Sequence, residues 1–475
     1  MKKHSLLKAI GFVFLVYVVL SWIIPGGSFS SGVFTKGTTS PLGLGDVFLY
    51  PIATSVYQMF VLSALVVCSI GGLYAILNKT GVLASMVSSI TKKFKGKEKL
   101  CIIITTIFYA LVSALLNLSL PMFVLIPLSV AVLVTLGFSK IKAFLATFGA
   151  ILVGNIGGMV GYNMDGYNYV NYFLGVEIKT TILYSLVLFV LSLAILLFFV
   201  IRNSKVSKKS SKGKKEAKEE VIIPLYSNKE VSKKPVAASI LFTILVILVL
   251  VSMFNWSAIN VNFFNDIHEA ITSFKVNGDY TLFANILGSI SAFGYWGNYE
   301  FIMITIITSI LIAWIYKVKA SDAIDTFLSG AKEMLPAACL VVLANILLYV
   351  TNSTATPYFQ TILNAFVGLS KSFNYFVVAG FTAVGSVIYS SYPYLLYAVY
   401  DPMKSLFESN LPMIALSMQA IYSICSLIVP TSIMLVLGLK YMDISYKEWF
   451  KNAWKLIVTL LVVISIALLI ISAII

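Results

Sequence analysis

Runs of apolar residues, each long enough for a membrane-spanning helix, recur along nearly the whole chain. A helix needs roughly 20 residues to cross about 30 Å of hydrocarbon, and about ten to twelve such runs can be counted. The first run follows His4, and no small-residue cleavage site of a secretory signal follows it, so we expect it to remain as a span. The pattern predicts an all-α polytopic membrane protein.

Composition and charge agree with a bilayer environment. Hydrophobic residues make up 59% of the chain and charged residues 11%, far from the balance of soluble domains. The net charge of +15 comes from lysines in the connections between apolar runs, which the positive-inside rule explains better than binding to nucleic acid does. Lys2, Lys3 and Lys8 predict a cytoplasmic N-terminus, in a multi-pass protein of a bacterial cytoplasmic membrane.

A polar segment divides the chain into two membrane halves, 1–202 and 236–475. The segment between them, 203–235, is rich in Lys, Ser and Glu and too polar to form a core, so it is predicted to be a flexible cytoplasmic linker. The connections 25–50 and 255–300 are poor in lysine and are expected to face outward.

The two halves share a series of matching residues at fixed offsets, which predicts two structural repeats. At an offset of 231, the residues Gly137, Ser139, Lys140, Gly149 and Gly154 recur as Gly368, Ser370, Lys371, Gly380 and Gly385. At an offset of 238, Leu73, Ala75 and Lys79 recur as Leu311, Ala313 and Lys317. Duplicated halves are the usual construction of secondary transporters. The residues leave open whether the repeats are parallel or inverted.

Each half contains a polar, proline-bearing interruption inside an apolar run, at 117–121 and at 351–357. Irregular backbone at membrane depth is tolerated only where it is buried in protein or lines a cavity, so both interruptions are predicted to be tips of re-entrant hairpins. Kinked helices or surface loops are the alternative. A third proline break includes Thr431 and Ser432, whose hydroxyls either bind a ligand or repair the backbone. The candidate substrate-binding residues are Asn117, Ser119, Asn352, Ser353, Thr354, Thr356, Thr431 and Ser432.

Two further broken segments follow the predicted tips and offer oxygen atoms for an ion. The candidate ion-binding residues are Asn155, Gly157, Gly158, Asp165, Ser386, Ser390 and Ser391. Backbone carbonyls at an unwound helix suit Na⁺, whereas Asp165 is the candidate for H⁺ coupling. We expect Na⁺ as the coupled ion. The alternatives are close helix packing through the glycines, a surface-loop position for Asp165, and solute exchange without any ion.

Catalytic and metal chemistry are not expected. The four cysteines lie singly in apolar segments and the two histidines are far apart, so no cofactor, no metal site and no enzyme activity are predicted. The expected partners are a small-molecule substrate and the lipid bilayer. The leading hypothesis is a secondary active transporter, a symporter or antiporter of a small organic acid or amino acid. The alternative is a channel or a membrane-biogenesis or assembly factor.

Several motifs in the same order resemble those of the YfcC-like family of the ion transporter superfamily. These motifs are WIIPGGSF at 22–29, GGLYAILNKTG at 71–81, VPTS at 429–432 and YKEW at 446–449. Members of that family are described as anaerobic four-carbon dicarboxylate carriers or basic amino-acid antiporters. The resemblance implies inverted repeats, each with a re-entrant hairpin, a dimer, and an elevator-like movement. Relatives carry acidic residues around the first hairpin where this chain has Leu118, Ser119 and Leu120, which argues against a cationic substrate.

Overall fold

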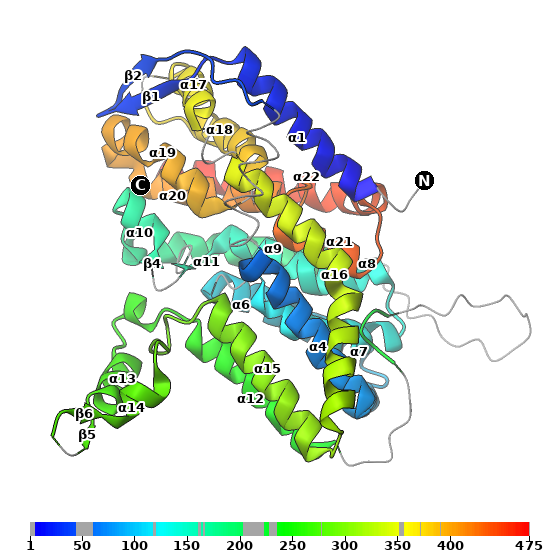
Figure 1. Ribbon diagram of the computed structural model, residues 1–475. Helices are drawn as coiled ribbons and strands as arrows, with labels where there is room; N and C mark the ends of the chain where they lie inside the picture. The colour runs from blue at the N-terminus through cyan, green and yellow to red at the C-terminus, as the bar shows by residue number, and fades with distance from the viewer. Residues whose placement is uncertain are drawn as a thin grey trace, which may run out of the picture.

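The computed structural model is helical almost throughout (Figure 1), and the described residues add three short antiparallel strand pairs. The residues that the structure describes are 5–43, 60–116, 120–159, 163–164, 167–202, 223–227, 235–276, 278–350, 356–370, 372–389 and 391–474.

Seven helices of the described residues are long and apolar enough to cross a membrane, or eight if one bent pair counts as a span. The bent pair is α4 (Leu65–Lys79) and α5 (Val82–Lys93), which meet at 82°. The others are α1 (Ser5–Ile23), α6 (Glu98–Leu116), a continuous run from Lys140 to Gly157, α11 (Ile178–Ile201), α15 (Asn298–Ile315), α16 (Ala320–Val350) and α22 (Tyr446–Ser472). A helical fold with many spans is therefore confirmed, and ten to twelve segments stay a prediction.

Shorter elements complete the described residues. The helices are α7 (Ile126–Thr135), α10 (Tyr169–Leu174), α12 (Val236–Ser252), α13 (Phe263–Thr272), α14 (Leu282–Leu287), α17 (Thr356–Val367), α18 (Tyr375–Ile388), α19 (Tyr392–Leu406), α20 (Leu411–Cys425) and α21 (Ile433–Tyr441). Single 3₁₀ or π turns are η2 (Phe60–Ala64), η3 (Pro121–Val124), η6 (Trp256–Ile259) and η8 (Glu408–Asn410). The strands pair as β1 (Gly27–Ser30) with β2 (Val33–Lys36), β3 (Asn163–Met164) with β4 (Tyr167–Asn168), and β5 (Lys275–Val276) with β6 (Tyr280–Thr281).

The buried helix α4 packs against both α15 and α16. Its crossing with α16 depends on two glycines, because a Cβ atom on Gly330 would lie 2.2 Å from the carbonyl oxygen of Gly71. The hydroxyl of Tyr74 donates to the carbonyl oxygen of Val124 at 2.7 Å and accepts from the backbone N–H of Leu128 at 3.2 Å. The glycine-rich motif at 71–81 therefore holds the start of α7 and the middle of α16 in place.

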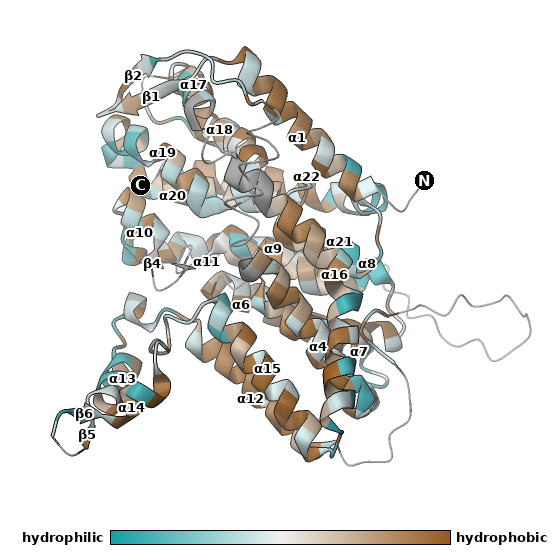
Figure 2. Cartoon of the chain, viewed as in Figure 1, coloured by the Kyte–Doolittle hydropathy of each residue, from teal (hydrophilic) through white to brown (hydrophobic). Residues whose placement is uncertain are grey.

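Apolar side chains cover the outside of the peripheral helices, as Figure 2 shows for α12 and α15. On α12, for example, Ile240 is 54% exposed and Ile247 is 53% exposed, while on α15 Ile310 is 61% exposed. A soluble protein rarely exposes so large an apolar surface. Lipid is the solvent that stabilises it, because chain packing leaves these side chains uncovered.

Connecting segments gather at the two ends of the molecule (Figure 1). The strand pair β1–β2, the helix α10 and the α13–α14 region lie toward one end, and the N-terminus lies toward the other. The two connections expected to face outward thus share one end. The predicted hairpin tips each fall between helices, one between α6 and η3 and the other between α16 and α17, and most of their residues lie outside the described part of the chain.

Part of the predicted flexible linker is held firmly against the helices. The helix α11 ends at Ile201 and α12 begins at Val236, and between them the structure describes 223–227. In this segment Leu225 is 3% exposed, and its backbone N–H donates to Oε1 of Glu333 at 3.1 Å. The hydroxyl of Tyr441 donates to the carbonyl oxygen of Pro224 at 3.0 Å. The polar composition of 203–235 hides this short apolar anchor.

Candidate functional site

The first broken segment starts as helix and loosens step by step toward Gly158. The π turn η4 (Leu145–Gly149) leads into α9 (Ala150–Gly154), which tightens into the 3₁₀ turn η5 (Asn155–Gly157). Gly158 then leaves the helix with ψ 114°. Two glycines here pack against neighbouring backbone, because a Cβ atom would lie 2.3 Å from the Ala110 carbonyl oxygen at Gly154 and 2.4 Å from the Phe189 nitrogen at Gly157. Close packing therefore accounts for these two glycines.

The end of this segment holds a buried cluster of neutral polar side chains from three helices. Ser113 of α6 donates to Oδ1 of Asn155 at 2.8 Å and also to the carbonyl oxygen of Ile151 at 2.8 Å. Gln419 of α20 donates through Nε2 to the carbonyl oxygen of Asn155 at 3.3 Å. All three side chains are buried. The cluster ties the first broken segment to α6 on one side and to α20 on the other.

The side chain of Gln419 explains why position 158 is a glycine. A Cβ atom on Gly158 would lie 1.7 Å from Nε2 of Gln419, so the amide occupies the space that any larger residue would fill. The glutamine thus reaches the unwound backbone itself.

A small cavity of about 20 Å³ adjoins the cluster, with space for about one water molecule. It is lined by Ile156, Gly158, Met159, Val170, Val176, Ile178, Thr181, Ser185, Ala415, Leu416 and Gln419. In this conformation the cavity admits an ion or a water molecule but no organic acid.

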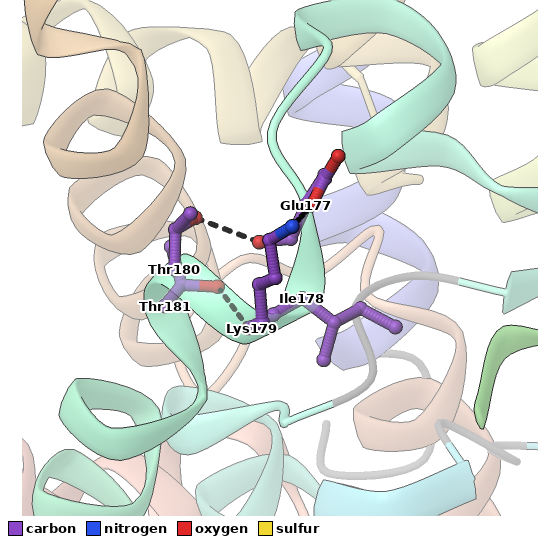
Figure 3. A network of polar contacts seen from close by, with 5 residues as sticks. All are labelled: Glu177, Ile178, Lys179, Thr180 and Thr181. Carbon is purple, nitrogen blue, oxygen red and sulfur yellow. Dashed lines mark hydrogen bonds and ion pairs between the residues drawn. The ribbon is translucent and has the colours of Figure 1, made fainter.

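The first turn of α11 lies beside this cavity and is polar (Figure 3). Glu177 and Lys179 form an exposed ion pair there, and the hydroxyl of Thr180 donates to the carbonyl oxygen of Glu177 at 2.7 Å. Thr181, which lines the cavity, donates to the carbonyl oxygen of Ile178 at 3.4 Å. The exposed charges place this turn at the water-facing end of α11.

Two of the predicted serines of the second broken segment are described, Ser386 and Ser391. Ser386 donates its hydroxyl to the carbonyl oxygen of Ala383 at 2.7 Å, inside its own helix. Beyond α18 the chain is extended at Tyr389, whose carbonyl oxygen accepts from the hydroxyl of Tyr422 at 3.0 Å. Ser391 is the residue before α19 and makes no capping hydrogen bond through its side chain. The hydroxyl oxygen of Ser386 keeps its lone pairs, so both serines stay predicted ion ligands.

The helix α20 lies between the two broken segments. It packs against both η5 and α18. Gln419 bonds to the first segment and Tyr422 bonds to the second, and these two residues are neighbours on one face of the helix. The structure therefore brings the two predicted ion-binding segments to neighbouring positions along one helix, which sequence reasoning did not anticipate.

The third break, between α20 and α21, is repaired by α22. Trp449 donates from Nε1 to the carbonyl oxygen of Leu427 at 2.9 Å, and the hydroxyl of Tyr446 donates to the carbonyl oxygen of Ile428. The hydroxyls of the break are not needed for that repair, and Thr431 keeps a buried Oγ1 without a hydrogen-bond partner. Buried hydroxyls are nearly always hydrogen-bonded. Thr431 is therefore available to bind a ligand or water.

Several predicted site residues lie outside the described residues, so their arrangement is not addressed by the structure. They are Asn117, Ser119, Asp165, Asn352, Ser353, Thr354 and Ser390. Thr356 begins α17, and only its backbone is described. Ser432 is buried at the start of α21. Within the described part of the chain, no group of three His, Cys, Asp or Glu side chains is placed to hold a metal ion.

Sequence reasoning missed Ser113, Gln419 and Tyr422. A weak signal existed for Gln419, because it is the single amide in the apolar run of α20. An amide is rarely buried in a membrane helix without a partner. The partner, Asn155, lies 264 residues away in the sequence, so no local pattern connects the two.

Comparison with known proteins decides the family. The family model described as "DcuC: C4-dicarboxylate anaerobic carrier" matches residues 4–473. The chain belongs to the DcuC family. This membership makes it a membrane carrier rather than an enzyme, and it confirms the predicted resemblance at the level of dicarboxylate carriers. The narrower YfcC-like assignment stays a prediction.

Two further comparisons add little to this result. A crystal structure of the YdaH transporter of Alcanivorax borkumensis, described as having an unusual topology, is 14% identical over 98% of this chain and 97% of that one, with a TM-score of 0.39. That similarity is too low to transfer any detail of a site. The comparison with curated proteins gave no match.

Proposed function

We propose that this protein is a secondary active transporter of four-carbon dicarboxylates across the cytoplasmic membrane, with its N-terminus in the cytoplasm. The observation that carries the proposal is the family match over 4–473, whose description names this substrate class. The neutral polar cluster of Ser113, Asn155 and Gln419 supports it, because amide and hydroxyl groups donate hydrogen bonds to carboxylate oxygens.

The binding site proposed here joins the hairpin tips to α20. The tips would supply Asn117 and Ser119 from the first half and 352–356 from the second, and Gln419 and Thr431 would complete the site from α20 and the break after it. Thr431 is suited to this role because its buried hydroxyl has no partner. The cavity beside Gln419 is too small for a dicarboxylate, so the proposed site extends beyond it toward the hairpin tips.

We further propose coupling to Na⁺ rather than H⁺. The oxygens gathered at the first broken segment are neutral, namely the carbonyl and Oδ1 of Asn155 and the hydroxyl of Ser113. Neutral oxygens coordinate Na⁺ without a titratable group. Uptake driven by a sodium gradient at equal pH supports this. Uptake that follows a pH gradient without sodium, and is lost in Asp165→Asn, contradicts it.

The proposed transporter is a homodimer built from two inverted repeats. Helix positions support a duplication. The offset between Lys79 and Lys317 also separates the first residue of α5, Val82, from the first residue of α16, Ala320. In the first half Lys79 ends α4, and in the second half Lys317 lies two residues after the end of α15. An elevator-like movement of one part against the other would then carry the substrate.

The site is tested by substituting Gln419 and measuring succinate uptake in proteoliposomes. Gln419→Leu should lower transport by roughly 5-fold to 150-fold, because it removes a donor worth roughly 1–3 kcal/mol when buried. The control is Ser423→Ala, one turn away on α20, which removes a bond inside that helix only. Equal uptake by both variants, at equal expression, would show that Gln419 is not part of the site.

A further inference from the structure

The region between α12 and α15 carries an apolar stripe that no other part of the described chain covers. On α13, Phe263, Ile267 and Ile271 lie one turn apart and are 60%, 40% and 41% exposed. Phe274 follows on the same face and its ring contacts that of Phe283 on the neighbouring α14 at 5.6 Å. The stripe consists of Phe263, Ile267, Ile271, Phe274, Phe283 and Ile286, all exposed.

The opposite face of α13 is polar and faces the connecting turns or water. Asp266 and Glu269 are exposed on that side. His268 makes a hydrogen bond through Nε2 with the carbonyl oxygen of Ile290 at 3.0 Å, and Asn265 donates to the hydroxyl of Ser257 at 3.3 Å. The helix is thus strongly amphipathic, and the hydrogen bonds that other parts of the chain make with α13 are on its polar side.

Aromatic packing fixes this region to the end of α12. Phe264 contacts Trp256 at 5.1 Å and Phe293 at 5.7 Å between ring centroids. Trp256 donates from Nε1 to the carbonyl oxygen of Val251 at 2.7 Å, and the N–H of Gly294 donates to the carbonyl oxygen of Ser252 at 2.6 Å. These aromatic contacts and hydrogen bonds therefore fix the orientation of the stripe relative to α12.

The position of these anchors indicates what the stripe contacts. The helix α12 has 17 residues, a length of about 25 Å, which is close to the thickness of the hydrocarbon layer. Val251 and Ser252 end that helix, so the aromatic anchors lie at the membrane–water boundary, where Trp residues are enriched. The helices α13 and α14 lie between α12 and α15 in the chain, two helices whose outer surfaces are apolar.

We propose that α13 and α14 lie flat in the headgroup region of the bilayer, with the apolar stripe inserted among the lipid chains and Asp266 and Glu269 in water. An amphipathic helix of this kind holds its protein at a fixed depth and tilt. Its polar face carries acidic rather than basic groups, so the contact depends on apolar burial and not on anionic lipid. The inference does not depend on the substrate.

Fluorescence quenching of labels on the two faces of α13 tests this proposal. Ile267→Cys and Glu269→Cys are made in full-length protein with its four cysteines replaced by alanine, labelled with bimane and reconstituted into phosphatidylcholine vesicles. We expect brominated lipid to quench the label at 267 several-fold more than aqueous iodide does, and the reverse at 269. Ile271→Cys serves as a second reporter on the stripe.

Two results overturn the proposal. Equal quenching by iodide at 267, 269 and 271 would mean that the stripe faces water. Protection of 267 and 271 from both quenchers, together with a cross-link between two copies at 267, would mean that a second copy of the chain covers the stripe.

Discussion

The anchor at 223–227 gives a prediction whose size follows from two hydrogen bonds. Asn78, at the end of α4, donates from Nδ2 to the carbonyl oxygen of Leu225 at 3.0 Å. Its Oδ1 accepts from the N–H of Ser227 at 3.1 Å. Each bond contributes about 1 kcal/mol. Asn78→Ala should therefore shift the equilibrium between held and released anchor by about 2 kcal/mol, or roughly 30-fold.

Hydrogen exchange measures this equilibrium directly. In Asn78→Ala the amides of 225–227 should exchange roughly 30-fold faster, while the peptide covering α4 stays protected. Asn78→Asp keeps the acceptor and loses the donor, so it should give an intermediate rate. Tyr441→Phe, which removes the bond to the carbonyl oxygen of Pro224, should accelerate exchange roughly fivefold.

The reasoning is refuted if exchange at 225–227 is as fast in the native protein as in the alanine variant. It is also refuted if α4 loses protection in parallel, because the substitution would then have unfolded the helix end and not released the anchor.

Burial raises the pKa of the Tyr226 hydroxyl, against the effect of its hydrogen bond to Thr135 on α7. That contact joins a further helix to the anchor.

Three other predictions concern packing and the site. Gly330→Ala should lower the free energy of unfolding by about 1–3 kcal/mol, measured as a lower Tm in detergent, because its Cβ atom would meet the backbone of Gly71; an unchanged Tm would show that α4 and α16 do not cross this closely. Trp449→Phe should lower the free energy of unfolding by about 1–3 kcal/mol, because the hydrogen bond to the carbonyl oxygen of Leu427 is lost. The control is Trp454→Phe, at an exposed position, which should change the free energy of unfolding by less than about 0.5 kcal/mol. Gly158→Ala should reduce uptake by displacing the Gln419 amide. Its effect on the free energy of unfolding should be non-additive with that of Gln419→Ala. Strict additivity of the two effects would mean that the two residues do not touch.

The breaks in the helices could be predicted because they follow from local chemistry. The cluster of glycines at 154, 157 and 158 and the proline at 430 weaken regular helix locally, and the structure has breaks at 158 and at 426–432. Two of the motifs behind the family resemblance take part in helix packing. Tyr446 and Trp449 satisfy the carbonyls of the break, and the 71–81 motif contains the glycine at the α4–α16 crossing.

The contacts that assemble the site could not be predicted from single segments. Gln419 is recognisable as unusual, but its position over Gly158 depends on how α20 packs against η5. The hydroxyl of Ser386 donates to the carbonyl oxygen of Ala383 in its own helix, an orientation that the sequence alone does not fix. Leu225 belongs to a short apolar run in a lysine-rich stretch, and its burial depends on Asn78 and Glu333 from distant helices.

Counterflow of a four-carbon dicarboxylate tests the central claim most directly. Purified protein is reconstituted into vesicles that contain unlabelled succinate, and a trace of radiolabelled succinate is added outside. A secondary transporter predicts a transient accumulation of label above equilibrium, saturable with substrate and absent from vesicles without protein. Label that only equilibrates, at a rate linear in concentration, would identify a channel and contradict the account.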